Sequence, residues 1–227
     1  MANHSKENGV PSGSFRDRQQ AGRLLSRALT HLKGRSPIVL ALPRGGVPVA
    51  AEVASALAAP LDVVVVRKIG APFHKELGVG ALVLLDQPEV VWNHSLLKEL
   101  GLREADLHDL VQDEEIEARR RLALYRGSRP ALDLKGRVVI LVDDGLATGI
   151  TAEAALQALR RTHPAHLVLA VPVAPPDTLE RLSKEADEVV CLKRPLWFSA
   201  VGQFYDDFAQ TSDAEVVSLL AQARLQH

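Results

Sequence analysis

The fold is decided by the stretch Val138-Val139-Ile140-Leu141-Val142-Asp143-Asp144-Gly145-Leu146-Ala147-Thr148-Gly149-Ile150-Thr151. Its first five residues are apolar and mostly β-branched, which predicts a strand buried on both faces of a parallel sheet. The turn after them is short and contains two glycines, and a helix is expected from Thr151 to Arg161. Ligands of open α/β sheets bind beyond the carboxyl ends of the strands, so this turn is predicted to lie at a binding site.

The turn carries groups that suit a sugar phosphate. Backbone N–H groups at the start of the following helix, with its positive dipole end, favour a phosphate. Thr148 and Thr151 add hydroxyl donors, and the carboxylates of Asp143 and Asp144 can accept hydrogen bonds from ribose hydroxyls. The stretch has neither the Gly-Lys-Ser/Thr of a Walker A loop nor the GxGxxG fingerprint of dinucleotide binding. The alternative is a plain strand and turn before a capped helix.

Strands and helices alternate on both sides of this stretch. Short apolar runs predict strands, and amphipathic segments predict the helices between them. Strands are expected at Pro37–Leu42, Leu61–Val66, Leu167–Val173 and Val189–Leu192, and helices at Phe15–Leu32, Val47–Leu57, Pro176–Ala186 and Ala214–Leu225. Such alternation implies right-handed crossovers, so the prediction is an α/β fold with a doubly wound, mostly parallel sheet.

The remaining segments depart from this alternation. Ile69–Gly80 contains glycines and a proline and is expected to be a loop. Ala81–Leu85 and Glu89–Trp92 predict a hairpin. The charged stretch Ser95–Arg126 predicts a helical insertion with a solvated surface and i,i+4 ion pairs. Pro195–Asp213 is irregular and aromatic.

Composition limits the classes of protein to be considered. The 227 residues suffice for one domain, expected over residues 15–227, after a tail at 1–14 that is expected to be disordered. A formal net charge of −1 argues against a nucleic-acid partner. There is no apolar run of bilayer length and no secretory h-region, so no membrane partner is expected. Cys191 is the only cysteine, which excludes an internal disulfide and favours a reducing, cytoplasmic location.

The stretch from Val138 to Thr151 resembles the motif with which type I phosphoribosyltransferases bind 5-phosphoribosyl-1-pyrophosphate (PRPP). That motif is an apolar strand, two acids, three further residues and Thr-Gly-x-Thr. Leu42-Pro43-Arg44-Gly45-Gly46 resembles the pyrophosphate loop of this family, and Arg67-Lys68 resembles the pair before its mobile catalytic loop. Alone, these two segments could be an ordinary turn and a solvated strand end, but the order and spacing of all three favour the family.

The resemblance covers about residues 36–192, the expected core of the type I phosphoribosyltransferase fold. With Phe15-Arg16-Asp17-Arg18 and Tyr205-Asp206-Asp207-Phe208 included, the chain is most similar to bacterial stand-alone phosphoribosyltransferase-domain proteins of undefined acceptor. The resemblance implies transfer of the phosphoribosyl group of PRPP to a nitrogenous acceptor, with Mg²⁺ as cofactor and pyrophosphate released. It also implies a homodimer.

Particular residues receive roles from this resemblance. Asp143 and Asp144 would hold the ribose hydroxyls and contact Mg²⁺ only through water. Together with Arg44 and Lys68 they form the expected catalytic set. Pyrophosphate binding is expected from Arg44, Gly45, Gly46 and Lys68, and 5′-phosphate binding from Ala147, Thr148, Gly149, Ile150 and Thr151. In this family the pyrophosphate loop often contains a cis peptide bond that does not precede proline, and the matching bond is Pro43–Arg44.

Two mobile or covering elements are also implied. The segment Gly70–Gly80 would close over the site and exclude water. The segment 195–213 would form a small C-terminal hood, with Trp197 or Phe198 stacking on the acceptor. The alternative is that these rings only pack the C-terminal helix onto the sheet.

Other functions remain open at this stage. A PRPP- or nucleotide-sensing regulatory protein without catalysis would need the same binding residues. A hydrolase of another α/β type is disfavoured, because the sequence has no Gly-x-Ser-x-Gly elbow and no metal-spaced histidine cluster. Ala147 stands where 6-oxopurine enzymes usually carry Asp, which disfavours hypoxanthine or guanine without identifying the acceptor.

Overall fold

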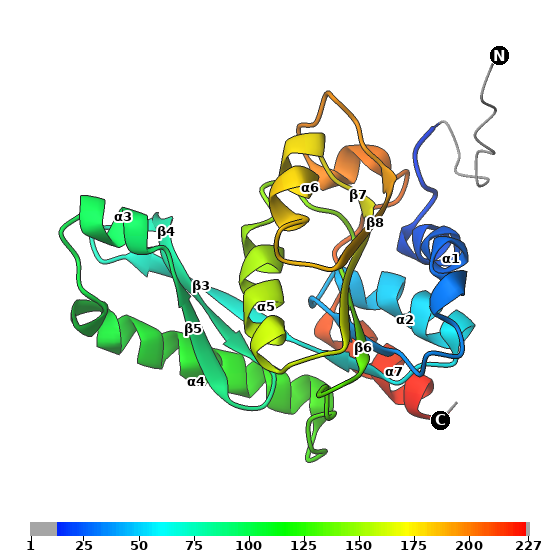
Figure 1. Ribbon diagram of the computed structural model, residues 1–227, viewed down its shortest axis with the longest axis horizontal. Coiled ribbons are helices and arrows are strands. Elements are labelled where there is room, and N and C mark those ends of the chain that lie inside the picture. Colours follow the sequence, from blue (N-terminus) through cyan, green and yellow to red (C-terminus); the bar gives the residue numbers. More distant parts are fainter. Residues whose placement is uncertain (1–12, 226–227) are drawn as a thin grey trace.

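A five-stranded parallel sheet forms the centre of the protein (Figure 1). The structure is a computed structural model that describes residues 13–225. The strands lie in the order β2 (Leu61–Val63), β1 (Ile38–Ala41), β6 (Val138–Val142), β7 (His166–Val173) and β8 (Glu188–Lys193). The order reverses between β1 and β6, which pair in parallel although about a hundred residues separate them. The predicted doubly wound sheet is confirmed.

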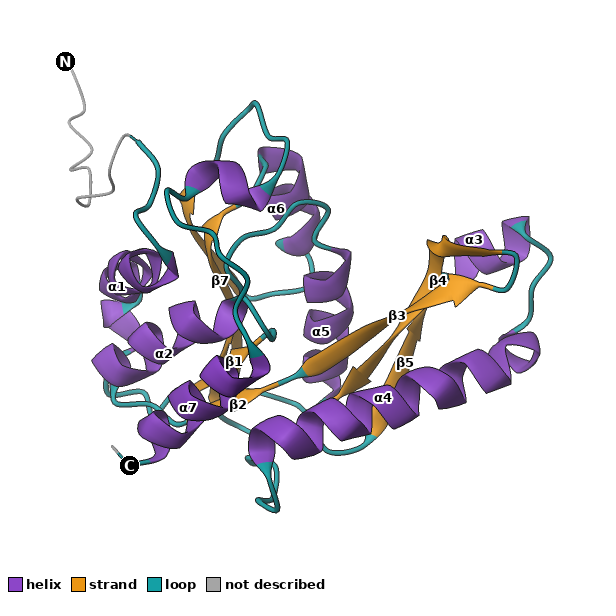
Figure 2. Ribbon diagram, turned by 180° about the vertical axis from the view of Figure 1, so that it is seen from behind, coloured by secondary structure: helices purple, strands orange, loops and turns teal. Residues whose placement is uncertain are grey.

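Helices cover both faces of this sheet, as Figure 2 shows. One face carries α1 (Arg18–Ala28), α2 (Gly46–Leu57) and α7 (Asp213–Arg224), and the other carries α5 (Ile150–Arg161) and α6 (Pro176–Leu182). Alternate residues of β1 face opposite layers. Val39 packs on the side covered by α2, Leu40 packs on the side covered by α5, and both are fully buried. This burial on both faces is why the central strands are continuous apolar runs.

A second, antiparallel sheet extends from the central body as an arm (Figure 1). It contains β3 (Val65–Ala71), β4 (His74–Leu84) and β5 (Pro88–Trp92), followed by α3 (His94–Glu99), a 3₁₀ turn (Glu104–Leu107) and α4 (His108–Arg126). The last residue of α4, Arg126, forms an ion pair with Asp62 of β2, with 2.9 Å between Nη2 and Oδ2. Both side chains are about 5% exposed, so this pair fixes the arm's helix to the central sheet inside the protein.

The expected loop Ile69–Gly80 is wrong, because most of it is strand. Residues 65–71 and 74–84 pair antiparallel with register shifts at Gly70, and Arg67 and Lys68 lie within β3 instead of ending a strand. A Cβ atom at Gly70 would lie 2.3 Å from the Lys75 carbonyl oxygen, and one at Gly78 would lie 2.8 Å from Cε of Lys68. These glycines therefore permit a bulge and close side-chain contacts within a sheet. The prediction is wrong because glycine is also common in turns and is therefore taken as a sign of a loop.

The expected hairpin around Asp86–Pro88 is present, since β4 and β5 pair from Gly80 opposite Trp92 to Leu84 opposite Pro88. Two short 3₁₀ turns, Thr30–Leu32 and Val201–Phe204, complete the secondary structure of residues 13–225. Most of the tail expected at 1–14 lies outside the described residues. Within 13–225, every helix is too short or too polar to cross a membrane.

Candidate active site

Two turns meet at the carboxyl ends of the neighbouring strands β1 and β6. The turn after β1 contains Pro43 to Gly46, and the turn after β6 contains Asp143 to Gly149. The amide of Leu42 donates to the carbonyl of Val142 at 2.9 Å, so the two turns begin at the same level of the sheet. This is the point at which the strand order reverses, where open α/β sheets bind their ligands.

The first turn lies directly against the two acids of the second. An added Cβ at Gly45 would lie 2.1 Å from Oδ2 of Asp144, and one at Gly46 would lie 2.8 Å from the Val142 carbonyl and 3.1 Å from Oδ1 of Asp143. Only glycine therefore permits this approach without a shift of the chain. The Pro43–Arg44 peptide bond is cis, as expected.

The two acids have different surroundings. Oδ1 of Asp143 accepts the backbone N–H of Asp144 at 2.8 Å, and the Asp143 side chain remains partly exposed at the strand edge. Asp144 is buried, and its Oδ2 accepts a hydrogen bond from Nε of Arg18 at 2.7 Å. The Tyr205 hydroxyl donates to the Asp144 carbonyl at 2.6 Å. Asp143 is therefore the acid that remains open to a ligand, and Asp144 is held by the protein.

Burial sets the electrostatics of this pair. Although residue Asp143 as a whole is partly exposed, its carboxyl group lies among protein atoms, and this desolvation together with the charge of Asp144 raises the pKa of Asp143 well above its usual range. Burial also raises the pKa of Asp144, although the Arg18 guanidinium opposes that shift. Two neighbouring carboxylates repel each other when both are charged, so hydroxyl donors or a cation would stabilise the ionised pair.

The turn before α5 leaves its amides free for an anion. Gly149 takes a left-handed conformation with φ of 69° and precedes the helix without capping it by a side chain. The Ala147 carbonyl accepts from the Thr178 hydroxyl at 2.8 Å, and the Thr148 carbonyl accepts from Arg181. Contacts from α6 thus hold the carbonyls of the turn from behind. The first N–H groups of α5 have no partner within the helix, so they can bind a phosphate.

The side chains of Thr148, Ile150 and Thr151 are exposed beside these amides. The structure thus brings together the predicted phosphate-binding residues in one uncapped helix start. The hydroxyls of the two threonines are available to a ligand there.

Arg44 is tethered to the C-terminal helix. Its Nη1 lies 3.7 Å from Oδ1 of Asp213, the first residue of α7. The same oxygen accepts the Tyr125 hydroxyl at 2.6 Å, and burial together with this hydrogen bond raises the pKa of Tyr125 to about 12. The loop arginine is therefore connected through α7 to α4.

Within the described chain, Lys68, Trp197 and Phe198 form no hydrogen bond or ion pair with the two turns that carry Arg44 and the acids. Lys68 donates to the backbone carbonyl of Glu76, across the arm hairpin. Phe198 stacks on Phe204 with 5.3 Å between ring centroids, and both rings are partly buried against a small cluster of Phe15, Ala21, Leu24, Val173 and Tyr205. Trp197 is 89% exposed. The roles expected for Lys68, Trp197 and Phe198 toward substrates stay predictions.

The acids at the strand edge fit a magnesium ion that is held partly by water and substrate. No group of three or more His, Cys, Asp or Glu side chains within residues 13–225 is arranged to hold a metal. Asp143 and Asp144 supply two adjacent carboxylates. Mg²⁺ commonly binds through one or two carboxylates, waters and substrate phosphates, so this donor set matches that mode.

The sequence reasoning missed the residues that support the site from behind. Arg18, Thr178, Arg181, Tyr205 and Asp213 received no role from the sequence and come from four different parts of the chain. Only Arg18 and Tyr205 gave a signal, since both belong to the segments that resemble the bacterial proteins. Their proximity to Asp144 depends on the packing of the hood against α1.

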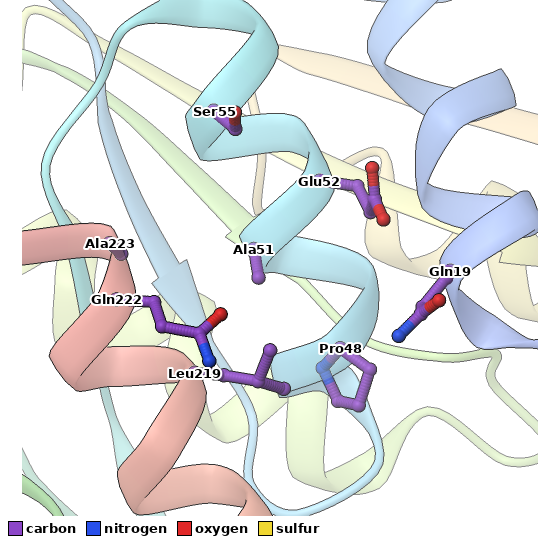
Figure 3. Close-up of a pocket in the computed structure, with 8 residues that line it drawn as sticks. All are labelled: Gln19, Pro48, Ala51, Glu52, Ser55, Leu219, Gln222 and Ala223. Carbon is purple, nitrogen blue, oxygen red and sulfur yellow. The ribbon is translucent and has the colours of Figure 1, made fainter. Parts of the chain in front are cut away.

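A separate hollow of about 210 Å³ lies between α2 and α7, beside the start of α1 (Figure 3). Its only charged lining residue is Glu52, which is paired with Arg23 at 2.9 Å. The other residues that line it are Gln19, Pro48, Ala51, Ser55, Leu219, Gln222 and Ala223. This hollow lacks the phosphate-binding amides and the acids of the strand edge.

An open parallel sheet with a glycine-containing turn and paired acids at its switch point has the arrangement in which α/β proteins bind their ligands. The chain belongs to the phosphoribosyl transferase domain family, whose sequence profile matches residues 17–209. Its fold is the type I phosphoribosyltransferase fold.

Known proteins with high similarity support this assignment. Proteins from two strains of Mycobacterium tuberculosis, provisionally named phosphoribosyl transferases, are 47% identical over 209 residues, which is 92% of this chain. The chain spans about half the length of these relatives, 47%. The crystal structure of TT1426 from Thermus thermophilus has 44% identity and a TM-score of 0.81, covering 92% of this chain and 98% of that one.

Proposed function

We propose that the protein transfers the phosphoribosyl group of PRPP to a nitrogenous acceptor and releases pyrophosphate. The observation that carries this proposal is the contact of the Gly45-Gly46 turn with Asp143 and Asp144, next to the uncapped start of α5. A phosphate held at that helix start would extend its ribose toward Asp143 and its pyrophosphate toward the turn after β1. The alternative of a plain strand, turn and capped helix is disfavoured because no side chain caps the start of α5.

The chemistry needs positioning and charge stabilisation more than a covalent nucleophile. As the bond from C1 to the pyrophosphate breaks, negative charge grows on the leaving group. Arg44 and the amides of Gly45 and Gly46 would stabilise that charge, and Lys68 is the further cation expected to contribute. Asp143 would orient the ribose through its hydroxyls. Magnesium, when bound, would neutralise part of the pyrophosphate charge.

Arg18 keeps Asp144 fixed in this scheme. Because Asp144 is already paired, we assign it to holding the turn in shape and to contact with a metal through water, and we assign ribose binding chiefly to Asp143. The hood residues Trp197 and Phe198 are the proposed acceptor contacts. Trp197 is the better candidate for stacking, because its ring is exposed whereas Phe198 is engaged with Phe204.

We expect a homodimer in the reducing cytoplasm, as the resemblance and the single cysteine imply. Measuring the mass in solution tests the dimer.

The test of function is pyrophosphate release from PRPP with Mg²⁺ and a panel of nucleobases and small amines. Release that depends on one acceptor, and that is lost in Asp143→Asn while the fold persists, supports the transferase. PRPP binding by calorimetry with no acceptor-dependent release indicates the sensing protein instead. No binding of PRPP at all contradicts both.

A further inference from the structure

Three arginines converge at the amino-terminal end of β2, at the edge of the sheet opposite the candidate active site. Arg126 ends α4, Arg129 follows it, and Arg224 ends α7. Figure 2 shows the C-terminal halves of α4 and α7 near β2, where Asp62 is located. The cluster therefore joins two helices that begin far apart in the chain.

The one acid of the cluster is already engaged. Arg126 binds Asp62 through two contacts, Nη2 to Oδ2 at 2.9 Å and Nε to Oδ1 at 3.2 Å. This pair is buried and neutralises itself. Among the residues that line the pocket described below, Asp62 is the only acid, so the charges of Arg129 and Arg224 have no carboxylate of their own there.

Arg129 and Arg224 also have donors that nothing in the described protein accepts. Nη2 of Arg224 donates to the Tyr125 carbonyl at 3.1 Å, and Nε of Arg129 donates to the Arg126 carbonyl at 3.1 Å. These bonds cap the C-terminus of α4. They leave Nε of Arg224 and Nη2 of Arg129 fully buried and without a partner among residues 13–225. Burial, together with the charge of Arg129, lowers the pKa of Arg224.

Helix capping explains the first two bonds but not the two remaining donors. Buried unpaired donors are rare in native proteins, and each points to a water or an ion. A water molecule would satisfy the hydrogen bonds without balancing two neighbouring positive charges. An anion would do both.

A pocket that the two arginines help to line has the size of a small anion site. Both arginines line a pocket of about 230 Å³. Its other walls include the apolar residues Pro60, Pro130 and Leu132. Sites for drug-sized ligands span roughly 300–1,000 Å³, so this pocket suits an ion or a small ester and not a whole nucleotide.

We propose that Arg129 and Arg224 form a binding site for a phosphate-type oxyanion, either inorganic phosphate or the phosphate end of a small ester. A guanidinium presents a planar fork of donors that matches two oxygens of such an ion. The site is separate from the candidate active site and does not depend on the proposed transfer reaction.

The test follows the Nε–H signal of Arg224 by ¹⁵N NMR on the full chain. That signal is identified by its loss in Arg224→Lys, and phosphate bound at the candidate active site moves other signals. Titration with inorganic phosphate should shift it saturably, with a dissociation constant below about 1 mM. Arg129→Gln should weaken binding about tenfold or more, because a charge-assisted contact is removed.

Arg119→Gln is the matched control. It removes the same charge from α4, but at a residue whose side chain is 49% exposed and paired with Glu115, so phosphate affinity at Arg224 should not change. Ribose 5-phosphate binding more tightly than phosphate identifies an ester, and weaker binding identifies the free ion. An Arg224 signal that does not move up to about 10 mM phosphate overturns the proposal, as does unchanged affinity in a folded Arg129→Gln. If that variant does not fold, the titration of the unmodified chain decides.

Discussion

Replacing Arg18 with Gln should destabilise the protein at neutral pH far more than at acidic pH. The Arg18 and Asp144 side chains are 11% and 13% exposed, with 2.7 Å between Nε and Oδ2. Arg18 also donates to the Ala209 carbonyl at 2.7 Å and lies 3.9 Å from the centroid of the Phe208 ring. One side chain thus connects the start of α1, the strand edge and the hood.

The size of the effect follows from these contacts. Removing one partner of a buried ion pair costs about 3–5 kcal/mol. Gln can still donate one hydrogen bond and the site is slightly exposed, so the lower end, about 3 kcal/mol, is expected after the loss of the ring contact is included. For a chain of this size that corresponds to a melting temperature lower by about 6–12 °C.

The pH dependence has a definite sign. The pKa of Asp144 is raised in the folded protein, so its carboxyl favours folding at low pH, and that contribution is lost as the pH rises through the folded-state pKa. Without Arg18 this pKa rises further. The deficit of the variant should therefore be largest above that higher pKa and should shrink as the pH falls through it, because the Asp144 carboxyl then becomes protonated.

Urea unfolding and thermal melting at neutral pH and near pH 4.5 measure this difference. Arg16→Gln serves as the control, because the Arg16 side chain is 64% exposed and its loss should change stability by less than about 0.5 kcal/mol. A deficit under about 1 kcal/mol at neutral pH, or an equal deficit at both pH values, would refute the reasoning.

Three further changes test the site itself. Changing Asp143 and Asp144 together to Ala should weaken PRPP binding by calorimetry at least about a hundredfold. Because the change also leaves Arg18 without its buried partner, the double variant is first shown to be folded by circular dichroism, and unchanged affinity in the folded variant would contradict the assignment of the acids. Gly45→Ala places a methyl group 2.1 Å from Oδ2 of Asp144 and should lower pyrophosphate release about a hundredfold or more, whereas Gly13→Ala, in open space, should not. Trp197→Ala should raise KM for the acceptor while PRPP affinity stays constant, and an equal loss of both would remove Trp197 from the acceptor site.

The sequence alone determined the central fold and the place of the candidate site in it. The apolar run Val138–Val142 can be buried on both faces only within a parallel sheet covered by helices. The acids and the Gly/Thr turn that follow it then lie at the carboxyl edge whatever the rest of the chain does. Local information suffices for these features because strand, turn and helix start are consecutive in the chain.

The tertiary structure alone decided how the acids differ and where the arm goes. Asp143 and Asp144 are equivalent in sequence, but only Asp144 receives Arg18, since α1 and the hood pack together over it. The glycines of 70–80 predict a loop by their local preference, but partner strands convert that segment into a hairpin. The cluster of Arg126, Arg129 and Arg224 likewise arises where the ends of two helices meet at β2, and such long-range proximity leaves no periodic signal in the chain.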